Sequence, residues 1–279
     1  MPGMCRSPVL LAAPLLSLLL LVTLAPAGCA KVEARELAKE GNDLYRAGKF
    51  DQALARFEAA ARLDPEFPTL QLHIGYTAMA LRTASAAAQG DRHARRAIAA
   101  FSRYMELKPA DERGPKFYLQ MLLDSGRNDE ALAFLERQHR DNPRDLKIVS
   151  SLGVVSSRVG RFPDALKWYE LRARLMPGES KARYLIGTLC WEQLYRNSKA
   201  VSIKRIEIAD RGIAALKQAL KLQPDYAEAL TYINLLYRER AKGQTDPGAQ
   251  EQDMAQARDY YGRAMKLINA ARRGSKGGK

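Results

Sequence analysis

Cysteine is scarce in this 279-residue chain, which contains only Cys5, Cys29 and Cys190. The first two lie at the ends of an apolar N-terminal stretch, which leaves Cys190 alone in the rest of the sequence. This scarcity excludes a disulfide framework, so an apolar core must hold the fold together. Apolar residues make up 47% of the chain, enough for such a core. Because Cys190 falls in an apolar helical stripe, we expect it to be a small buried side chain.

Histidine is equally rare, and His73, His93 and His139 have no cysteine or carboxylate beside them at metal-ligand spacing. The sequence also lacks a glycine-rich phosphate loop, a Gly-x-Ser-x-Gly elbow and a His-Glu-x-x-His motif. Without any constellation of catalytic residues, the sequence predicts a protein that is not an enzyme and needs no metal or cofactor.

Charge is nearly absent from the N-terminus, where Arg6 is the only charged residue before Lys31. An apolar run from Val9 to Leu24 is followed by small residues, a pattern that predicts a signal peptide over residues 1–28. The uncharged stretch also approaches the roughly 20 residues that a membrane-spanning helix needs. An uncleaved membrane anchor, or plain secretion, therefore stays open as the alternative.

The residues that end this stretch, Ala27-Gly28-Cys29, resemble a bacterial lipobox, although Pro26 stands where that motif usually has leucine. The resemblance implies that Cys29 is lipidated and becomes the mature N-terminus, followed by a short linker over residues 29–33. It also implies a membrane-anchored lipoprotein of the bacterial cell envelope that faces the periplasm or the exterior. If the N-terminus is not cleaved, the chain would be an anchored scaffold facing the cytoplasm.

Prolines recur along the rest of the chain at Pro65, Pro109, Pro143, Pro177 and Pro224, at intervals of 44, 34, 34 and 47 residues. The short interval is the period of a helix–turn–helix repeat, and the long intervals exceed it by 10 and 13 residues. Self-similarity of this kind predicts an all-α solenoid of about six antiparallel helix pairs over residues 34–267.

The same pattern comes before each proline: a small residue in one helix is followed by an Ala-x-x-x-aromatic run in the next helix. The first motif has Gly41, Phe50, Ala53, Phe57 and Ala60 before Pro65. Later motifs repeat it with Gly75, Ala97 and Phe101; Leu122, Gly126, Ala131 and Leu135; Gly153, Gly160, Phe162, Ala165 and Tyr169; Gly187, Leu216 and Ala219; and Ala257, Tyr261 and Ala264. Leu119, Gly212 and Asn234 depart from it.

This pattern resembles the tetratricopeptide repeat (TPR) family. The resemblance implies a right-handed superhelix whose inner helices line a concave groove that binds peptides or protein segments, with no implied reaction. The repeat register then assigns groove positions to Asn42, Tyr45, Tyr76, Lys116, Gln120, Arg158, Tyr184, Thr188, Trp191 and Arg238. Aromatic and arginine side chains dominate binding energy at interfaces, but an aromatic at such a position can equally pack between helices.

The extra residues of the longer repeats are expected between the two helices of a pair, near residues 83–95, 195–207 and 242–251. Without Arg6, the chain has 44 Lys and Arg against 31 Asp and Glu, a net charge of +13. Segments 82–96 and 195–206 and the tail from residue 272 contribute +3, +4 and +4 of this. We therefore expect a basic rim formed by Arg92, Arg95, Arg96, Lys199, Lys204 and Arg205. Anionic headgroups or an acidic protein are its candidate partners, whereas solvated basic loops are the alternative.

No polar capping segment follows the sixth repeat, only a basic flexible tail expected over residues 268–279. The last helix would present Tyr260, Tyr261, Met265 and Ile268, which suggests a homo-oligomer as an alternative. Together these features predict a membrane-tethered, extracytoplasmic scaffold that binds a protein or peptide and assists assembly of an envelope complex. The sequence contains no nucleic-acid-binding module, which disfavours that class of partner.

Overall fold

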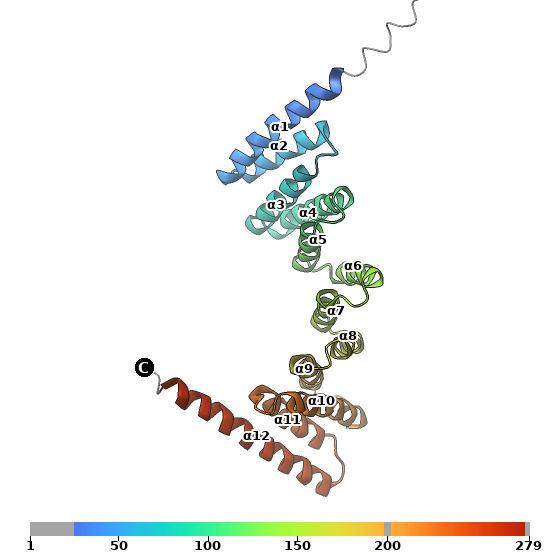
Figure 1. Cartoon of the computed structure of the whole chain (residues 1–279), viewed down its shortest axis with the longest axis vertical. Helices are drawn as coiled ribbons and strands as arrows, with labels where there is room; N and C mark the ends of the chain where they lie inside the picture. Colours follow the sequence, from blue (N-terminus) through green and yellow to red (C-terminus); the bar gives the residue numbers. More distant parts are fainter. Residues whose placement is uncertain (1–24, 198–201, 277–279) are drawn as a thin grey trace, which may run out of the picture. The chain divides into compact units, whose positions relative to one another are not determined.

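The computed structural model describes residues 25–197 and 202–276, and Figure 1 shows the order of the helices. The described residues contain twelve helices and no strand. The helices are α1 (Ala25–Arg46), α2 (Phe50–Leu63), α3 (Pro68–Ala84), α4 (Ala87–Leu107), α5 (Arg113–Asp124), α6 (Asn128–Asp141), α7 (Leu146–Arg158), α8 (Phe162–Leu175), α9 (Ser180–Arg196), α10 (Ser202–Leu222), α11 (Ala227–Ala241) and α12 (Pro247–Lys276). Twelve helices are the number that six pairs require, so the predicted all-α helix-pair fold is confirmed.

The chain divides into two compact units, Met1–Gly126 with α1–α5 and Arg127–Lys279 with α6–α12. We refer to them as unit 1 and unit 2. Within each unit, every helix packs against its neighbours in sequence. In unit 2, α9 also packs against α11, the first helix of the following pair. This contact between first helices brings side chains of two successive repeats onto one surface.

The glycine in the first helix of a pair allows the second helix to approach closely. A Cβ atom added at Gly41 would lie 2.6 Å from Cε1 of Phe57. In the fourth pair, a Cβ at Gly153 would lie 2.6 Å from Cδ1 of Tyr169. Since real Cβ atoms do not come this close to ring carbons, only glycine fits opposite these rings. The same relation holds for Gly75 with Phe101 and for Gly187 with Leu216.

In the repeats that carry no insert, a glycine in the left-handed backbone conformation forms the turn between the two helices. Gly48, Gly126 and Gly160 have φ values of 73°, 73° and 75°, a region that other residues rarely adopt. At the first of these turns, the Gly48 N–H donates to the carbonyl of Tyr45 at 3.0 Å and the Lys49 N–H donates to that of Leu44 at 2.9 Å. These bonds pair the last carbonyls of α1 and end the helix.

The inserts of the longer repeats mainly lengthen helices. Helices α4 and α10 have 21 residues each and α12 has 30, whereas α2, α6 and α8 have 14. Only Ser85 and Ala86 separate α3 from α4, so most of the predicted loop at 83–95 is helical. The alanine-rich sequence around this turn explains the difference, because alanine is the best helix former.

Both predicted ends of the solenoid need correction. Residues 29–33, expected as a linker, lie within α1, and the tail expected as flexible from residue 268 is helical as far as Lys276 in α12. Packing against α11 supports the preceding turns of α12, so the helix continues into the basic tail. Residues 1–24 of the predicted signal peptide lie outside the described residues. Among the described helices, none is both long and apolar enough to cross a membrane.

In the sixth pair, Tyr260 rather than Tyr261 packs inside. Tyr260 is 9% exposed and stacks on Tyr237 with ring centroids 5.8 Å apart, whereas Tyr261 is 54% exposed. Asn234 occupies the position that glycine holds in other repeats, and it is 7% exposed. The prediction that Tyr260 is presented at the surface is therefore wrong. Tyr261 is exposed as predicted for the last helix, but its assignment to the packed ring position of the sixth motif is wrong.

Candidate functional site

Five aromatic rings form a continuous strip on α9 and α11 in unit 2. We define the aromatic strip as Tyr226, Tyr184, Tyr232, Trp191 and Tyr195. The ring of Tyr184 lies 5.0 Å from that of Tyr226 and 5.6 Å from that of Tyr232, centroid to centroid. Trp191 continues the strip, 5.4 Å from Tyr232 and stacked at 5.0 Å on Tyr195. Aromatic pairs at these separations attract one another, so each ring holds the next in place.

Helical spacing explains why the rings meet. Tyr184, Trp191 and Tyr195 are separated by seven and four residues, which places them on one side of α9. Tyr232 reaches them from α11, which packs against α9, and Tyr226 lies at the N-cap of α11. Four of the rings are partly buried against the apolar core, and Tyr195 is 68% exposed. The strip therefore offers large aromatic surfaces that are rigidly held and still accessible.

The hydroxyls of Tyr184 and Tyr226 in the strip remain protonated at neutral pH. Burial raises the pKa of Tyr184, and the neighbouring Tyr232 and Tyr226 add to the effect. Burial also raises the pKa of Tyr226, with a further contribution from the charge of Glu228. A neutral phenol both donates and accepts a hydrogen bond. The strip can therefore bind an apolar group on its ring faces and a backbone amide or carbonyl at its hydroxyls.

In unit 1, several predicted groove residues contact neighbouring rings, although Tyr45 and Lys116 stay exposed. The Tyr76 ring lies 5.8 Å from Phe101 and 4.9 Å from Phe117, and the ammonium of Lys116 lies 5.4 Å from the centre of the Phe117 ring. Tyr45 meets Phe50 edge-on at 5.2 Å. Asn42 is half-buried and Gln120 is exposed. The rings of Tyr76, Phe101 and Phe117 form a group of three in which Phe101 is fully buried, so the group offers less ring surface than the aromatic strip.

Of the remaining predicted residues, some have exposed side chains and others form ion pairs with carboxylates. Arg158 at the end of α7 and Arg238 on α11 are exposed, as are Arg92 and Lys204. Arg95 pairs with Asp91, and Arg96 pairs with Glu58 at 2.8 Å. Lys199 lies outside the described residues. Much of the charge expected on a basic rim is thus neutralised by nearby carboxylates.

The prediction that Arg205 belongs to the basic rim is wrong. Arg205 is 6% exposed, and its guanidinium forms an ion pair with Glu239 of α11, which is 7% exposed. Lys242 also contacts the Glu239 carboxylate at 2.5 Å. A buried guanidinium needs an opposite charge, and the carboxylate of α11 provides it. Arg205 therefore fixes the beginning of α10 to the end of α11 instead of facing a partner.

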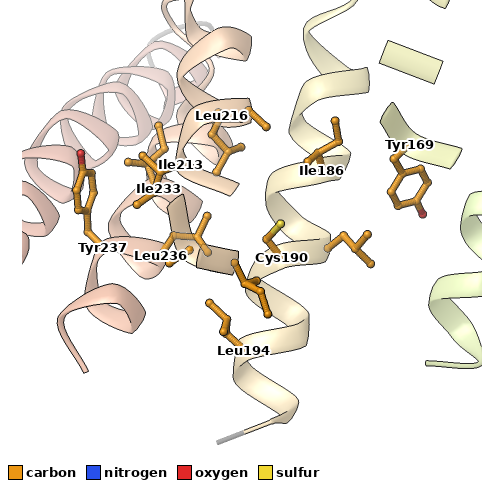
Figure 2. Close-up of a cluster of buried hydrophobic side chains, with 14 of the residues drawn as sticks. Tyr169, Ile186, Cys190, Leu194, Ile213, Leu216, Ile233, Leu236 and Tyr237 are labelled. Atoms are coloured by element: carbon orange, nitrogen blue, oxygen red, sulfur yellow. The ribbon is translucent and has the colours of Figure 1, made fainter. Parts of the chain in front are cut away.

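Cys190 is surrounded by apolar side chains of α9, α10 and α11, as Figure 2 shows. It is 0% exposed, and burial raises the pKa of its thiol from 9.0 to about 12. The expectation of a buried packing residue is confirmed. Among the described residues, no cluster of three or more His, Cys, Asp or Glu side chains could hold a metal ion.

In a variant with serine at positions 5 and 29, we expect Cys190 of the folded protein to resist iodoacetamide at pH 8. In urea, the same thiol should react fully. Because its pKa is higher folded than unfolded, its contribution to stability is full below pH 9 and is lost as the pH rises from 9 toward 12. A cysteine introduced at the exposed Ala133 serves as the control and should react without urea. Rapid labelling of Cys190 in the folded protein, measured by mass spectrometry, would contradict its burial.

Sequence reasoning missed Tyr195, Tyr226 and Tyr232. Tyr195 follows Trp191 by one helical turn, a spacing that was readable from the sequence. Tyr232 belongs to the next repeat, and its contact with Trp191 depends on how α9 and α11 pack. Tyr226 lies just before a helix, where periodicity gives no information. The strip as a whole therefore becomes visible only in three dimensions.

Comparisons with known proteins agree with the repeat assignment. The family model described as TPR repeat matches residues 41–81, which include Gly41, Phe57, Pro65 and Gly75. No curated protein matches the sequence.

Three solved structures illustrate the similarity. YrrB, a TPR protein with an unusual peptide-binding site, is 19% identical with a TM-score of 0.43 over 74% of this chain and 96% of that chain. MamA of Desulfovibrio magneticus RS-1 is 17% identical with a TM-score of 0.31 over 85% and 96%. The C-terminal part of a TPR repeat-containing protein from Cytophaga hutchinsonii is 16% identical with a TM-score of 0.49 over 84% and 80%.

Proposed function

Because this chain carries the tetratricopeptide repeat, we propose that it is a non-enzymatic scaffold that binds a peptide segment of another protein. The aromatic strip is the observation that carries this proposal. Trp191, Tyr184 and Tyr232 lie on the first helices of successive pairs, the helices that line the groove in this family. Tryptophan and tyrosine are the residue types most often responsible for binding energy at protein interfaces.

The strip favours an extended segment with apolar or proline side chains. Ring faces that stand side by side accept such side chains in turn, and the phenol hydroxyls can pair with the backbone between them. The neighbouring rings already hold one another in place, so little side-chain freedom is lost on binding. These two properties make a peptide ligand more suitable here than a small molecule.

Replacing Trp191 by alanine tests the proposal. Peptides would first be selected from a phage-displayed library of random 12-residue sequences, and their affinities measured by calorimetry. Removing a central aromatic contact is expected to weaken binding about 30-fold, which corresponds to about 2 kcal/mol. Tyr261→Ala, on the exposed side of α12, is the matched control and should leave affinity unchanged. Failure to select any binder, or binders indifferent to Trp191→Ala, would contradict the proposal.

We further propose that the scaffold is tethered to a membrane of the bacterial cell envelope through lipid on Cys29, facing the periplasm or exterior, and that it assists assembly of an envelope complex. The exposure of Cys29 on α1 supports this, because modification requires an accessible thiol. Mass spectrometry of the protein from membranes is expected to show an N-terminus at Cys29 carrying acyl chains, and Cys29→Ser should release the chain. An intact N-terminus would favour the anchored, cytoplasm-facing alternative.

A second candidate function, an oligomeric structural adaptor, is favoured by the exposure of Tyr261 on the last helix. Met265 and Ile268 lie one and two turns further along α12 and are half-buried. A second copy could cover these side chains. Sedimentation at micromolar concentration decides between the two, because a dimer that Tyr261→Arg dissociates would support the adaptor and a monomer would exclude it.

A further inference from the structure

A hollow of about 440 Å³ lies between α8, α9 and α10 in unit 2, apart from the aromatic strip. Residue Ile186 of α9 contributes to its wall. Successive residues of an α-helix are rotated by about 100°, so Ile186 points away from the side of α9 that carries Tyr184 and Trp191. The hollow is therefore a second surface, on the other side of the same helix.

Positive charge lines this hollow in excess. Arg174, Arg183 and Arg211 all contribute to it, with Glu170 as the acidic residue of its lining. The Arg211 guanidinium donates to the Glu170 carboxylate at 2.6 Å, which neutralises that pair. No carboxylate in the described part of the chain forms an ion pair with Arg174 or Arg183. Two guanidinium groups thus remain available to an anion.

The position of Arg183 adds to this preference. It lies in the first turn of α9, which itself contains no acidic residue and carries the partial positive charge of the helix N-terminus; Glu179 is the N-cap residue. The preceding Glu179 is already bound by Arg172 at 2.8 Å. A cation at a helix N-terminus is electrostatically unfavourable, so an incoming carboxylate would relieve the repulsion as well as pair with the guanidinium.

The floor of the hollow is apolar. Ala173, Ile186 and Ala215 are 4%, 6% and 8% exposed, and Pro177 also lines the hollow. These side chains offer nothing to a bare anion but can contact an apolar side chain. A volume of about 440 Å³ lies within the range of roughly 300–1,000 Å³ that is usual for ligand sites.

We propose that this hollow binds an acidic peptide segment in which a carboxylate adjoins an apolar side chain. The carboxylate pairs with Arg174 and Arg183, and the apolar side chain rests on Ala173 and Ile186. Charge complementarity favours this ligand, since the chain carries a net charge of +14 and the hollow itself is basic. The apolar floor distinguishes it from inorganic phosphate, which has no group to place there.

The test uses a fluorescein-labelled peptide, Asp-Leu-Glu-Phe-Asp-Leu-Glu, titrated with the full protein in a fluorescence anisotropy measurement. Binding is expected to weaken at least tenfold when Arg174→Glu and Arg183→Glu are combined. The matched control combines Arg137→Glu with Arg144→Glu, which removes the same charge from exposed positions elsewhere in unit 2 and should change the affinity less than twofold. A peptide with Asn and Gln in place of Asp and Glu should not bind.

Two further variants separate an effect on this hollow from misfolding and from binding at the aromatic strip. Ala214→Trp fills the hollow from an exposed lining position, retains every charge and is expected to weaken binding at least tenfold. Trp191→Ala should have no effect, so this site and the strip can fail separately. Circular dichroism checks each variant, and Arg174→Gln replaces the double reversal if that variant does not fold.

Several outcomes would overturn the proposal. These outcomes are no binding of the peptide by the native protein, equal weakening by the control pair and the test pair, and equal binding of the neutral peptide. Binding of inorganic phosphate or phosphatidylglycerol vesicles that depends on Arg174 and Arg183, without binding of the peptide, would assign the hollow to phosphate chemistry instead.

Discussion

Replacing Glu239 with alanine is expected to lower the free energy of unfolding of unit 2 by about 3–5 kcal/mol. The substitution leaves the guanidinium of Arg205 buried without its carboxylate, and burying a charge without an opposite charge beside it is costly. Urea unfolding monitored by circular dichroism measures the loss. A decrease below about 1 kcal/mol would mean that Arg205 reaches water, contrary to its 6% exposure.

Two comparisons isolate the cause. Glu251→Ala removes a carboxylate whose ion pair with Arg258, at 2.6 Å, lies on the surface, and is expected to change stability by less than about 0.5 kcal/mol. The double replacement of Arg205 by methionine and Glu239 by leucine should restore most of the loss, because apolar residues of similar size need no charged partner. Recovery in the double variant would show that loss of the carboxylate opposite the Arg205 charge, rather than lost packing, is responsible.

Alanine at Gly153 should destabilise the protein, whereas alanine at Gly262 should stabilise it. The new methyl group at position 153 would lie 2.6 Å from Cδ1 of Tyr169, and overfilling of this kind is expected to cost about 2 kcal/mol. At position 262, in α12, no atom lies within 4 Å of the new Cβ, so the higher helix propensity of alanine should add about 1 kcal/mol.

Thermal melts of the two variants should therefore move in opposite directions, by about 2–4 °C per kcal/mol for a unit of this size. The identical substitution in two helices of the same unit removes any general effect of replacing glycine. Equal shifts in the two variants would show that α7 and α8 do not approach as closely as the repeat contact requires.

Much of the fold was predictable because its helix contacts are local and repeat along the chain. Gly41 with Phe57 and Gly153 with Tyr169 are 16 residues apart, and one spacing pattern therefore locates both contacts. The turn at Gly48 is also encoded locally, since only glycine readily adopts its φ of 73°. Such features need no knowledge of the rest of the chain.

Features that depend on the inserts were not predictable. The sequence shows that Arg205 is charged but does not show that lengthening α10 brings it beside Glu239, 34 residues away. Similarly, the sequence does not show that Tyr260, rather than Tyr261, stacks on Tyr237 of the neighbouring helix. The aromatic strip was predicted only in part. The repeat register identified Tyr184 and Trp191, whereas the position of Tyr232 depends on the packing of α9 against α11.

Photo-crosslinking in the cells that make this protein tests its proposed role most directly. A photoreactive residue in place of Thr188 would lie on α9 between Tyr184 and Trp191, next to the strip. The account predicts a discrete protein adduct that disappears when Trp191→Ala and Tyr232→Ala are introduced together. No adduct at this position, or adducts only from a probe at Lys204, would contradict binding at the aromatic strip.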